Sequence, residues 1–218
     1  MSNYQFAIDQ NSLNAMLILA AKKDIRYYLN GLHIEFAPEF TRVVACDGHK
    51  LGIYQKAVDS FNIGAGSLTI PRDVIENLPK NAGFLEFIAS APYDTKWNIK
   101  TANGLQITFS ACDSKYPDFR RVVDQANKTS GEAAGFNLNY LNEFEKCGNL
   151  LAGSKLKIGN RIRIHHNGHN GALITLNCVD NFAGIVMPLR DSVGSSGALF
   201  PADLVSAIPG AADQLKAA

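Results

Sequence analysis

Three histidines that stand close together are the residues of this 218-residue chain best suited to bind a metal ion. His165, His166 and His169 carry imidazole nitrogens, which are common zinc ligands. However, Asn167-Gly168 and Asn170-Gly171 are typical turn pairs, and no carboxylate or cysteine stands at ligand spacing. A polar hairpin tip is therefore the favoured interpretation, and a metal-dependent enzyme remains a second alternative.

Other groups that could act as acids, bases or nucleophiles are poorly arranged for catalysis. Asp47 and His49 flank Gly48 in an expected tight turn, which is poor geometry for a base and the group that orients it. Glu143 and Glu145 are two residues apart and would face different sides of a helix. Glycine-rich phosphate-binding motifs are missing from the sequence. We therefore expect a protein that is not an enzyme and needs no cofactor.

Composition places the chain among ordinary globular proteins. The formal net charge is +1, so any nucleic-acid surface must be local, at Lys22-Lys23, Arg120-Arg121 or within 155–163, and each of these is also readable as a solvated face. The four cysteines are scattered, which favours reduced, buried thiols. No apolar run approaches the roughly 18 residues of a membrane span, and the N-terminus lacks a signal pattern. We expect a cytoplasmic protein without membrane contact.

The elements that must position these residues recur along the chain. An extended apolar stub followed by a helix start occurs four times, at intervals of about 60–65 residues, which indicates repeated supersecondary units. The helix starts carry good capping or first-turn residues, namely Asn11 or Ser12, Pro71, Asn137 and Pro201. Strand-like stretches follow the first three helices, at 31–54, then 84–88, 97–101 and 105–109, then 155–158, 161–165, 172–176 and 184–187.

Each repeat therefore predicts a β-α-β-β-β unit. One unit is too small to bury a core, because its sheet and its helix each need a partner. Paired units predict an α+β fold in which helices lie on one face of antiparallel sheets.

Several motifs resemble the bacterial DNA polymerase III β subunit family, the sliding clamps. Residues 24–31 resemble the family run D-[IV]-R-Y-Y-L-N-G, and 45–51 resemble A-T-D-G-H-[RK]-L, with Cys46 in place of threonine. Residues 115–122 resemble the connector F-P-D-Y-R-R-V, and 185–190 resemble the closing V-V-M-P-M-R. The resemblance implies the DNA-clamp fold: a complete middle domain at 1–123, a linker at 124–134, half of a last domain at 135–190, and a Gly/Ser link with an extra strand–helix tail at 191–218. The chain is thus expected to be a shortened and rearranged relative, of a phage or plasmid type.

The resemblance also implies a pocket for short peptides from polymerases and other replication or repair proteins. Carried over position by position, this predicted peptide pocket comprises Leu29, Cys46, Gly48, His49, Lys50, Leu51, Pro117, Arg121, Val122, Asn137, Tyr140, Ile185, Met187, Pro188, Leu189 and Arg190. Aliphatic and methionine side chains suit an adaptable apolar floor. Without the resemblance, Leu29, Leu51, Ile185 and Met187 would be assigned to the core.

Double-stranded DNA, bound without sequence preference, is the second implied partner. Its contacts are predicted at the tip after the first helix, from Lys22, Lys23, Arg26, Tyr27 and Tyr28. Polymerase and clamp-loader peptides are the implied protein partners, and a homo-oligomer is expected if a ring closes. A clamp-like inhibitor or decoy that does not encircle DNA is the first alternative. Residues 198–200, Ala-Leu-Phe, resemble the end of a clamp-binding peptide, although a stub strand is the favoured interpretation.

Overall fold

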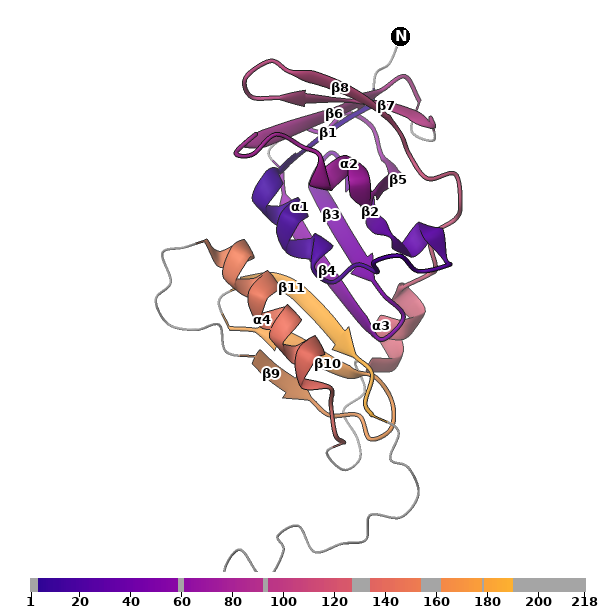
Figure 1. Cartoon of the computed structure of the whole chain (residues 1–218), viewed down its shortest axis with the longest axis vertical. Coiled ribbons are helices and arrows are strands. Elements are labelled where there is room, and N and C mark those ends of the chain that lie inside the picture. The colour runs from indigo at the N-terminus through magenta and orange to yellow at the C-terminus, as the bar shows by residue number, and fades with distance from the viewer. Residues whose placement is uncertain are drawn as a thin grey trace, which may run out of the picture.

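Two antiparallel sheets form the framework of the protein (Figure 1). The computed structural model describes residues 4–58, 61–91, 94–126, 134–153, 162–177 and 179–189. The smaller sheet has the strand order β1-β6-β7-β8, with β1 at Tyr4–Asp9, β6 at Phe84–Ala89, β7 at Lys96–Thr101 and β8 at Gln106–Ser110. The larger sheet has the order β5-β2-β3-β4-β11-β10-β9, with β5 at Gly66–Pro71, β2 at Gly31–Ala37, β3 at Phe40–Cys46, β4 at Lys50–Ala57, β11 at Val179–Val186, β10 at Ala172–Leu176 and β9 at Ile162–His165.

Helices cover one face of the larger sheet. They are α1 (Gln10–Leu17), α2 (Arg72–Glu76) and α4 (Leu138–Ala152), and α1 and α4 lie side by side (Figure 1). A short 3₁₀ helix, η1 (Tyr27–Leu29), precedes β2, and α3 (Arg120–Ala126) packs near β10. The predicted α+β class, with helices on one face of antiparallel sheets, is confirmed.

Alternation along the strands divides the apolar residues between two clusters. Val43 and Ala45 belong to the large core under the helices, whereas Val44 belongs to a second cluster with Leu51 and Ile185. Since successive side chains of a strand point to opposite faces, this second cluster lies on the face of the larger sheet that α1 and α4 do not cover.

The large core packs tightly against α1 at one glycine of β4. A Cβ atom on Gly52 would lie 2.4 Å from Leu19 Cδ1, so a larger residue would displace the Leu19 side chain from the core.

The central β4–β11 pair joins distant parts of the chain. Leu51 lies opposite Ile185 and Tyr54 opposite Phe182, so the strands after α1 and α4 form one continuous sheet. This pairing brings residues 46–51 beside residues 185–187, which positions the site described below.

Most predicted elements are confirmed, with differences at their ends. Asn137 caps α4 as predicted, accepting a hydrogen bond from the Asn139 backbone N at 2.9 Å. The first cap is Asp9 instead of Asn11 or Ser12, because the Asp9 carboxylate accepts from both the backbone N and the hydroxyl of Ser12.

The third repeat differs more, since residues 135–136 before α4 form no strand and β11 begins five residues earlier than predicted. The connector also contains α3, which the strand and helix patterns do not predict. The strand predicted at 155–158, the predicted helix start at Pro201 and the 191–218 tail lie outside the described residues.

Candidate functional site

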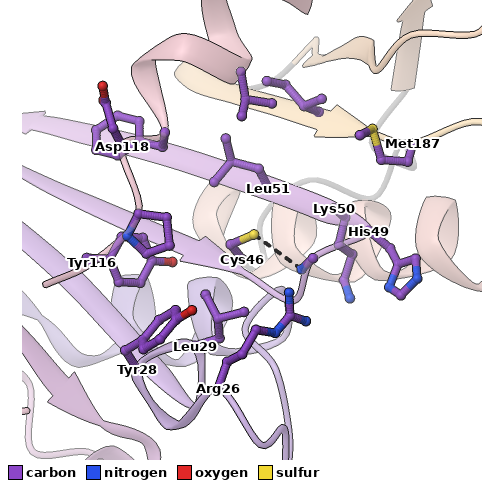
Figure 2. A pocket seen from close by; sticks show the side chains of 15 residues that line it. Arg26, Tyr28, Leu29, Cys46, His49, Lys50, Leu51, Tyr116, Asp118 and Met187 are labelled. Atoms are coloured by element: carbon purple, nitrogen blue, oxygen red, sulfur yellow. Dashed lines mark hydrogen bonds between the residues drawn. The ribbon is translucent and has the colours of Figure 1, made fainter. Parts of the chain in front are cut away.

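A pocket of about 230 Å³ opens on the face of the larger sheet opposite α1 and α4. Segments far apart in the sequence meet there: η1, the hairpin between β3 and β4, the connector before α3, and the end of β11 (Figure 2). Its lining consists of Arg26, Tyr28, Leu29, Cys46, Gly48, His49, Lys50, Leu51, Tyr116, Pro117, Asp118, Phe119, Val122, Ile185 and Met187.

The floor of the pocket is apolar and its rim is exposed. Leu29, Leu51 and Ile185 are buried and pack together in the second cluster, while Met187 at the rim is 45% exposed. An exposed methionine beside buried aliphatic side chains provides a surface that can adapt to an incoming side chain.

A turn at 47–50 fixes the polar edge of the pocket. Asp47 Oδ1 accepts hydrogen bonds from the backbone N of His49 at 2.8 Å and of Lys50 at 2.9 Å. Gly48 has φ +94°, a left-handed conformation that favours glycine, and a Cβ there would also displace the Arg26 guanidinium, which lies 2.7 Å from that position. Asp24 holds that guanidinium through two hydrogen bonds of 3.0 and 2.8 Å, which lowers the Asp24 pKa to about 2.

The same turn contacts α4 on the other side of the sheet. The Lys50 ammonium lies 2.8 Å from Glu143 Oε2, forms a second ion pair with Asp47, and lies 5.1 Å from the centre of the Tyr140 ring. Burial alone would lower the pKa of Lys50, but its hydrogen bonds to Asp47 and Glu143 outweigh burial and raise this pKa. The His49 ring stacks on Tyr140 at 5.7 Å. The 47–50 turn at the edge of the pocket is therefore in direct contact with α4.

Cys46 and Tyr116 place polar atoms next to the apolar side chains of the pocket. Cys46 Sγ accepts a hydrogen bond from the Gly48 backbone N at 3.3 Å, and burial raises the pKa of this thiol, so the neutral form is favoured. Tyr116 is 7% exposed, and burial followed by the nearby Cys46 raises its pKa well above the usual range. The Tyr116 ring stacks on His33, with centroids 4.6 Å apart and planes 8° apart.

Most residues of the predicted peptide pocket lie together, and several do not. Ten line the cavity: Leu29, Cys46, Gly48, His49, Lys50, Leu51, Pro117, Val122, Ile185 and Met187. Arg121 is exposed on α3 outside the lining, Asn137 caps α4, and Tyr140 faces His49 and Lys50 from α4. Pro188 and Leu189 follow β11 beyond the lining, and Arg190 lies outside the described residues.

The motifs also missed several lining residues. Tyr116, Asp118 and Phe119 surround Pro117 in the connector, and the two aromatic residues close to the proline, Tyr116 and Phe119, were a usable signal. Arg26 and Tyr28 were assigned to DNA contacts, yet both line this cavity.

The remaining predicted DNA contacts lie around the loop after α1. Lys22 and Lys23 are exposed, and both border a polar depression between that loop and α4. Tyr27 is exposed, with its hydroxyl 3.4 Å from Asp113 Oδ1 and close to Ser114. Both lysine side chains are therefore exposed to solvent at the edge of this depression.

The three histidines considered as metal ligands, and the described cysteines, lie within or beside the secondary structure without forming a metal site. His165 lies in β9, with Nε2 3.3 Å from Thr175 Oγ1, His166 packs on Phe136, and His169 is exposed in a turn. Within the described ranges, no group of three or more possible metal ligands gathers. The described cysteines are free thiols, but Cys46 and Cys112 are only half-buried, which corrects the prediction that the thiols are buried. None of the described helices is long and apolar enough to cross a membrane.

Comparison with known proteins finds sliding clamps among the relatives of this chain. Residues 7–118 match the family model for the central domain of the DNA polymerase III beta subunit. A beta sliding clamp from Proteus mirabilis is 31% identical over 147 residues, covering 63% of this chain and 38% of the relative. A beta sliding clamp from Caulobacter vibrioides is 26% identical over 134 residues, covering 56% of this chain and 35% of the relative. The chain thus spans about a third of the length of these curated relatives.

Solved structures support the same fold. The DNA polymerase sliding clamp of Pseudomonas aeruginosa superposes with a TM-score of 0.62 at 20% identity, covering 86% of this chain and 66% of that one. The DNA polymerase III beta subunit of Thermotoga maritima superposes with a TM-score of 0.65 at 15% identity, covering 87% of this chain and 66% of that one. Because the central-domain model matches more than half of the residues of this chain, the chain belongs to the DNA polymerase III beta subunit family.

Proposed function

We propose that this protein is a sliding-clamp-like processivity factor, without enzymatic activity, whose pocket binds short peptides of polymerases, clamp loaders or other replication and repair proteins in the cytoplasm. The observation that carries this proposal is the apolar cavity formed by the β3–β4 turn, the connector and the end of β11. Its floor of Leu29, Leu51 and Ile185 suits one or two inserted apolar side chains, and the polar side chains of Arg26 and His49 in the lining can fix the orientation of the peptide.

Double-stranded DNA is the second partner that we propose. Lys22 and Lys23 are exposed next to α1 and α4, on the side of the larger sheet opposite the pocket. Lysines contact phosphates without reading sequence, which is the kind of contact that sliding requires. We also propose that 1–123 is a whole clamp domain and 135–190 half of one, and that a homo-oligomer is needed to surround DNA.

Peptide binding is tested with a fluorescent peptide ending in Leu-Phe, by anisotropy. Met187→Glu and Val122→Glu place a charge at the pocket rim and should each weaken binding at least about tenfold. Both positions are already exposed, so folding should survive. Ile63→Glu, at an exposed apolar position away from the pocket, is the matched control. Equal affinities for all four proteins would refute the pocket.

DNA association is tested on primed circular DNA. The protein should increase the processivity of its polymerase, and Lys22→Ala with Lys23→Ala should reduce DNA retention and its salt dependence. Lys96→Ala, which removes an exposed lysine on β7, should leave DNA retention and its salt dependence unchanged. A monomer by light scattering at micromolar concentration, together with unchanged processivity, would instead support the non-encircling inhibitor.

A further inference from the structure

The hydroxyl group of Tyr116 is an unusual feature of the pocket. Its oxygen is buried and has no hydrogen-bond partner among the described residues. Buried polar groups nearly always have a partner, and one without costs stability. A hydroxyl retained at such a cost next to a cavity indicates a partner that arrives with a ligand.

Packing holds this hydroxyl in place. The Tyr116 ring stacks on His33 at 4.6 Å, and His33 Nδ1 lies 3.2 Å from Thr69 Oγ1, which fixes the histidine in turn. Figure 2 shows the hydroxyl directed toward the part of the pocket formed by Cys46 and Leu29. The group therefore cannot reach solvent by a small rotation of its own ring.

The surroundings favour a donated hydrogen bond. Burial keeps Tyr116 in its neutral form, so the phenol retains its proton. The nearby Cys46 sulfur already accepts from the Gly48 backbone and is a weak acceptor. Tyr116 also stands where the family motif F-P-D-Y-R-R-V carries Phe, so its hydroxyl is a departure of this chain from that motif.

We propose that Tyr116 is a specificity-determining residue, whose hydroxyl donates a hydrogen bond to an acceptor atom on the apolar side chain that a partner peptide inserts. The inference rests on the proposed peptide-binding function and narrows its ligand class to side chains that carry an ether, thioether or carbonyl acceptor. Entry of that side chain shifts Leu29 or Cys46, whose side chains can change rotamer, and brings the acceptor to the hydroxyl.

The first test needs no ligand. Tyr116→Phe removes only the unpaired hydroxyl and should raise the melting temperature of the free protein by about 2–4 °C. Tyr54→Phe, at a buried tyrosine on the opposite face of the sheet, is the control and should not raise it. A Tyr116→Phe protein that melts at the same or a lower temperature would overturn the inference.

The second test measures selectivity by calorimetry with two Leu-Phe-type peptides. At the inserted position one carries norleucine and the other O-methyl-homoserine, in which an ether oxygen replaces a methylene group. The affinity ratio of the ether peptide to the norleucine peptide should be about five- to tenfold higher for the natural protein than for Tyr116→Phe. Tyr54→Phe should keep the natural ratio.

The outcomes separate the two proposals. If both peptides bind and the ratio is the same in the natural protein and Tyr116→Phe, only the specificity inference fails. If neither peptide binds the natural protein, the peptide-binding function fails and the inference fails with it.

Discussion

Acid should destabilise this protein within a defined pH interval, because His33 is buried beside Tyr116. The His33 side chain is 13% exposed, and burial lowers its pKa from 6.5 to about 4. Two charged groups face the ring: Glu35, 4.0 Å from Nε2, opposes this shift, and Arg120 adds to it. The folded protein therefore holds His33 neutral at pH values where an unfolded chain would bind a proton.

The sign and size of the effect follow from these two pKa values. Above pH 6.5 His33 is neutral in both states, and its contribution to folding stability is complete. As the pH falls from 6.5 to about 4, the unfolded chain takes up a proton that the folded protein excludes, so the free energy of unfolding decreases. The pKa difference is about 2.5, which sets an upper limit of about 3 kcal/mol, reached near pH 4.

Urea denaturation followed by tryptophan fluorescence, between pH 7.5 and 4, measures this loss. Trp97 is buried in the large core and reports unfolding. His33→Phe keeps a ring for the stack on Tyr116 but cannot titrate, so between pH 6.5 and 4 its free energy of unfolding should decrease less than that of the natural protein, by up to about 3 kcal/mol. His169→Gln removes an exposed histidine and should follow the natural protein. If His33→Phe and the natural protein lose the same stability between pH 6.5 and 4, burial does not hold His33 neutral in the folded protein.

Three further predictions concern the turn, the thiol and the sheet. Lys50→Met leaves Glu143 without its cation and should lower the free energy of unfolding by about 2 kcal/mol. Adding Glu143→Gln to this variant should lower the free energy of unfolding only slightly further. If urea denaturation shows that the losses of the two single variants add up in the double variant, Lys50 and Glu143 do not stabilise each other. Cys46 should react with iodoacetamide about tenfold more slowly than glutathione at pH 8, because burial raises its pKa, and equal rates by mass spectrometry would contradict this. Gly31→Ala places Cβ 2.3 Å from a β5 carbonyl oxygen and should cost at least about 2 kcal/mol, measured against Gly135→Ala, where Cβ meets nothing closer than 3.8 Å.

Motifs in the sequence located the two strands and the turn that bound the pocket. Alternating residues in β2 and the Asp-Gly pair after β3 specify short strands and a tight turn, and both signals are local. The repeat of about 60–65 residues then predicted the paired units. Local pattern and repeat together were sufficient for the fold class.

The placement of the residues that close the pocket depends on contacts between distant segments, which local patterns do not specify. Tyr116 lies at the cavity because the connector packs on β2, where its ring stacks on His33 and Arg120 forms two hydrogen bonds with Glu35, a residue 85 positions away. No period or motif encodes that contact. Conversely, Tyr140 was assigned to the pocket, but α4 packs beside α1 and so presents Tyr140 to the helix side of the turn.

The turn at 47–50 connects the two surfaces that the proposed function requires. Leu51 belongs to the pocket floor on one face of the sheet, while the preceding Lys50 is paired with Glu143 of α4 on the other. Consecutive residues of a strand must point to opposite faces, so a shift of this strand that opens the pocket also strains the ion pair with α4. A peptide that displaces the turn would therefore change how α4 is held, and the exposed Lys22 and Lys23 lie beside that contact. Peptide binding should then alter DNA retention in the natural protein and do so less in Glu143→Gln. Equal coupling in both proteins, measured as the DNA dissociation rate with and without peptide, would exclude this route.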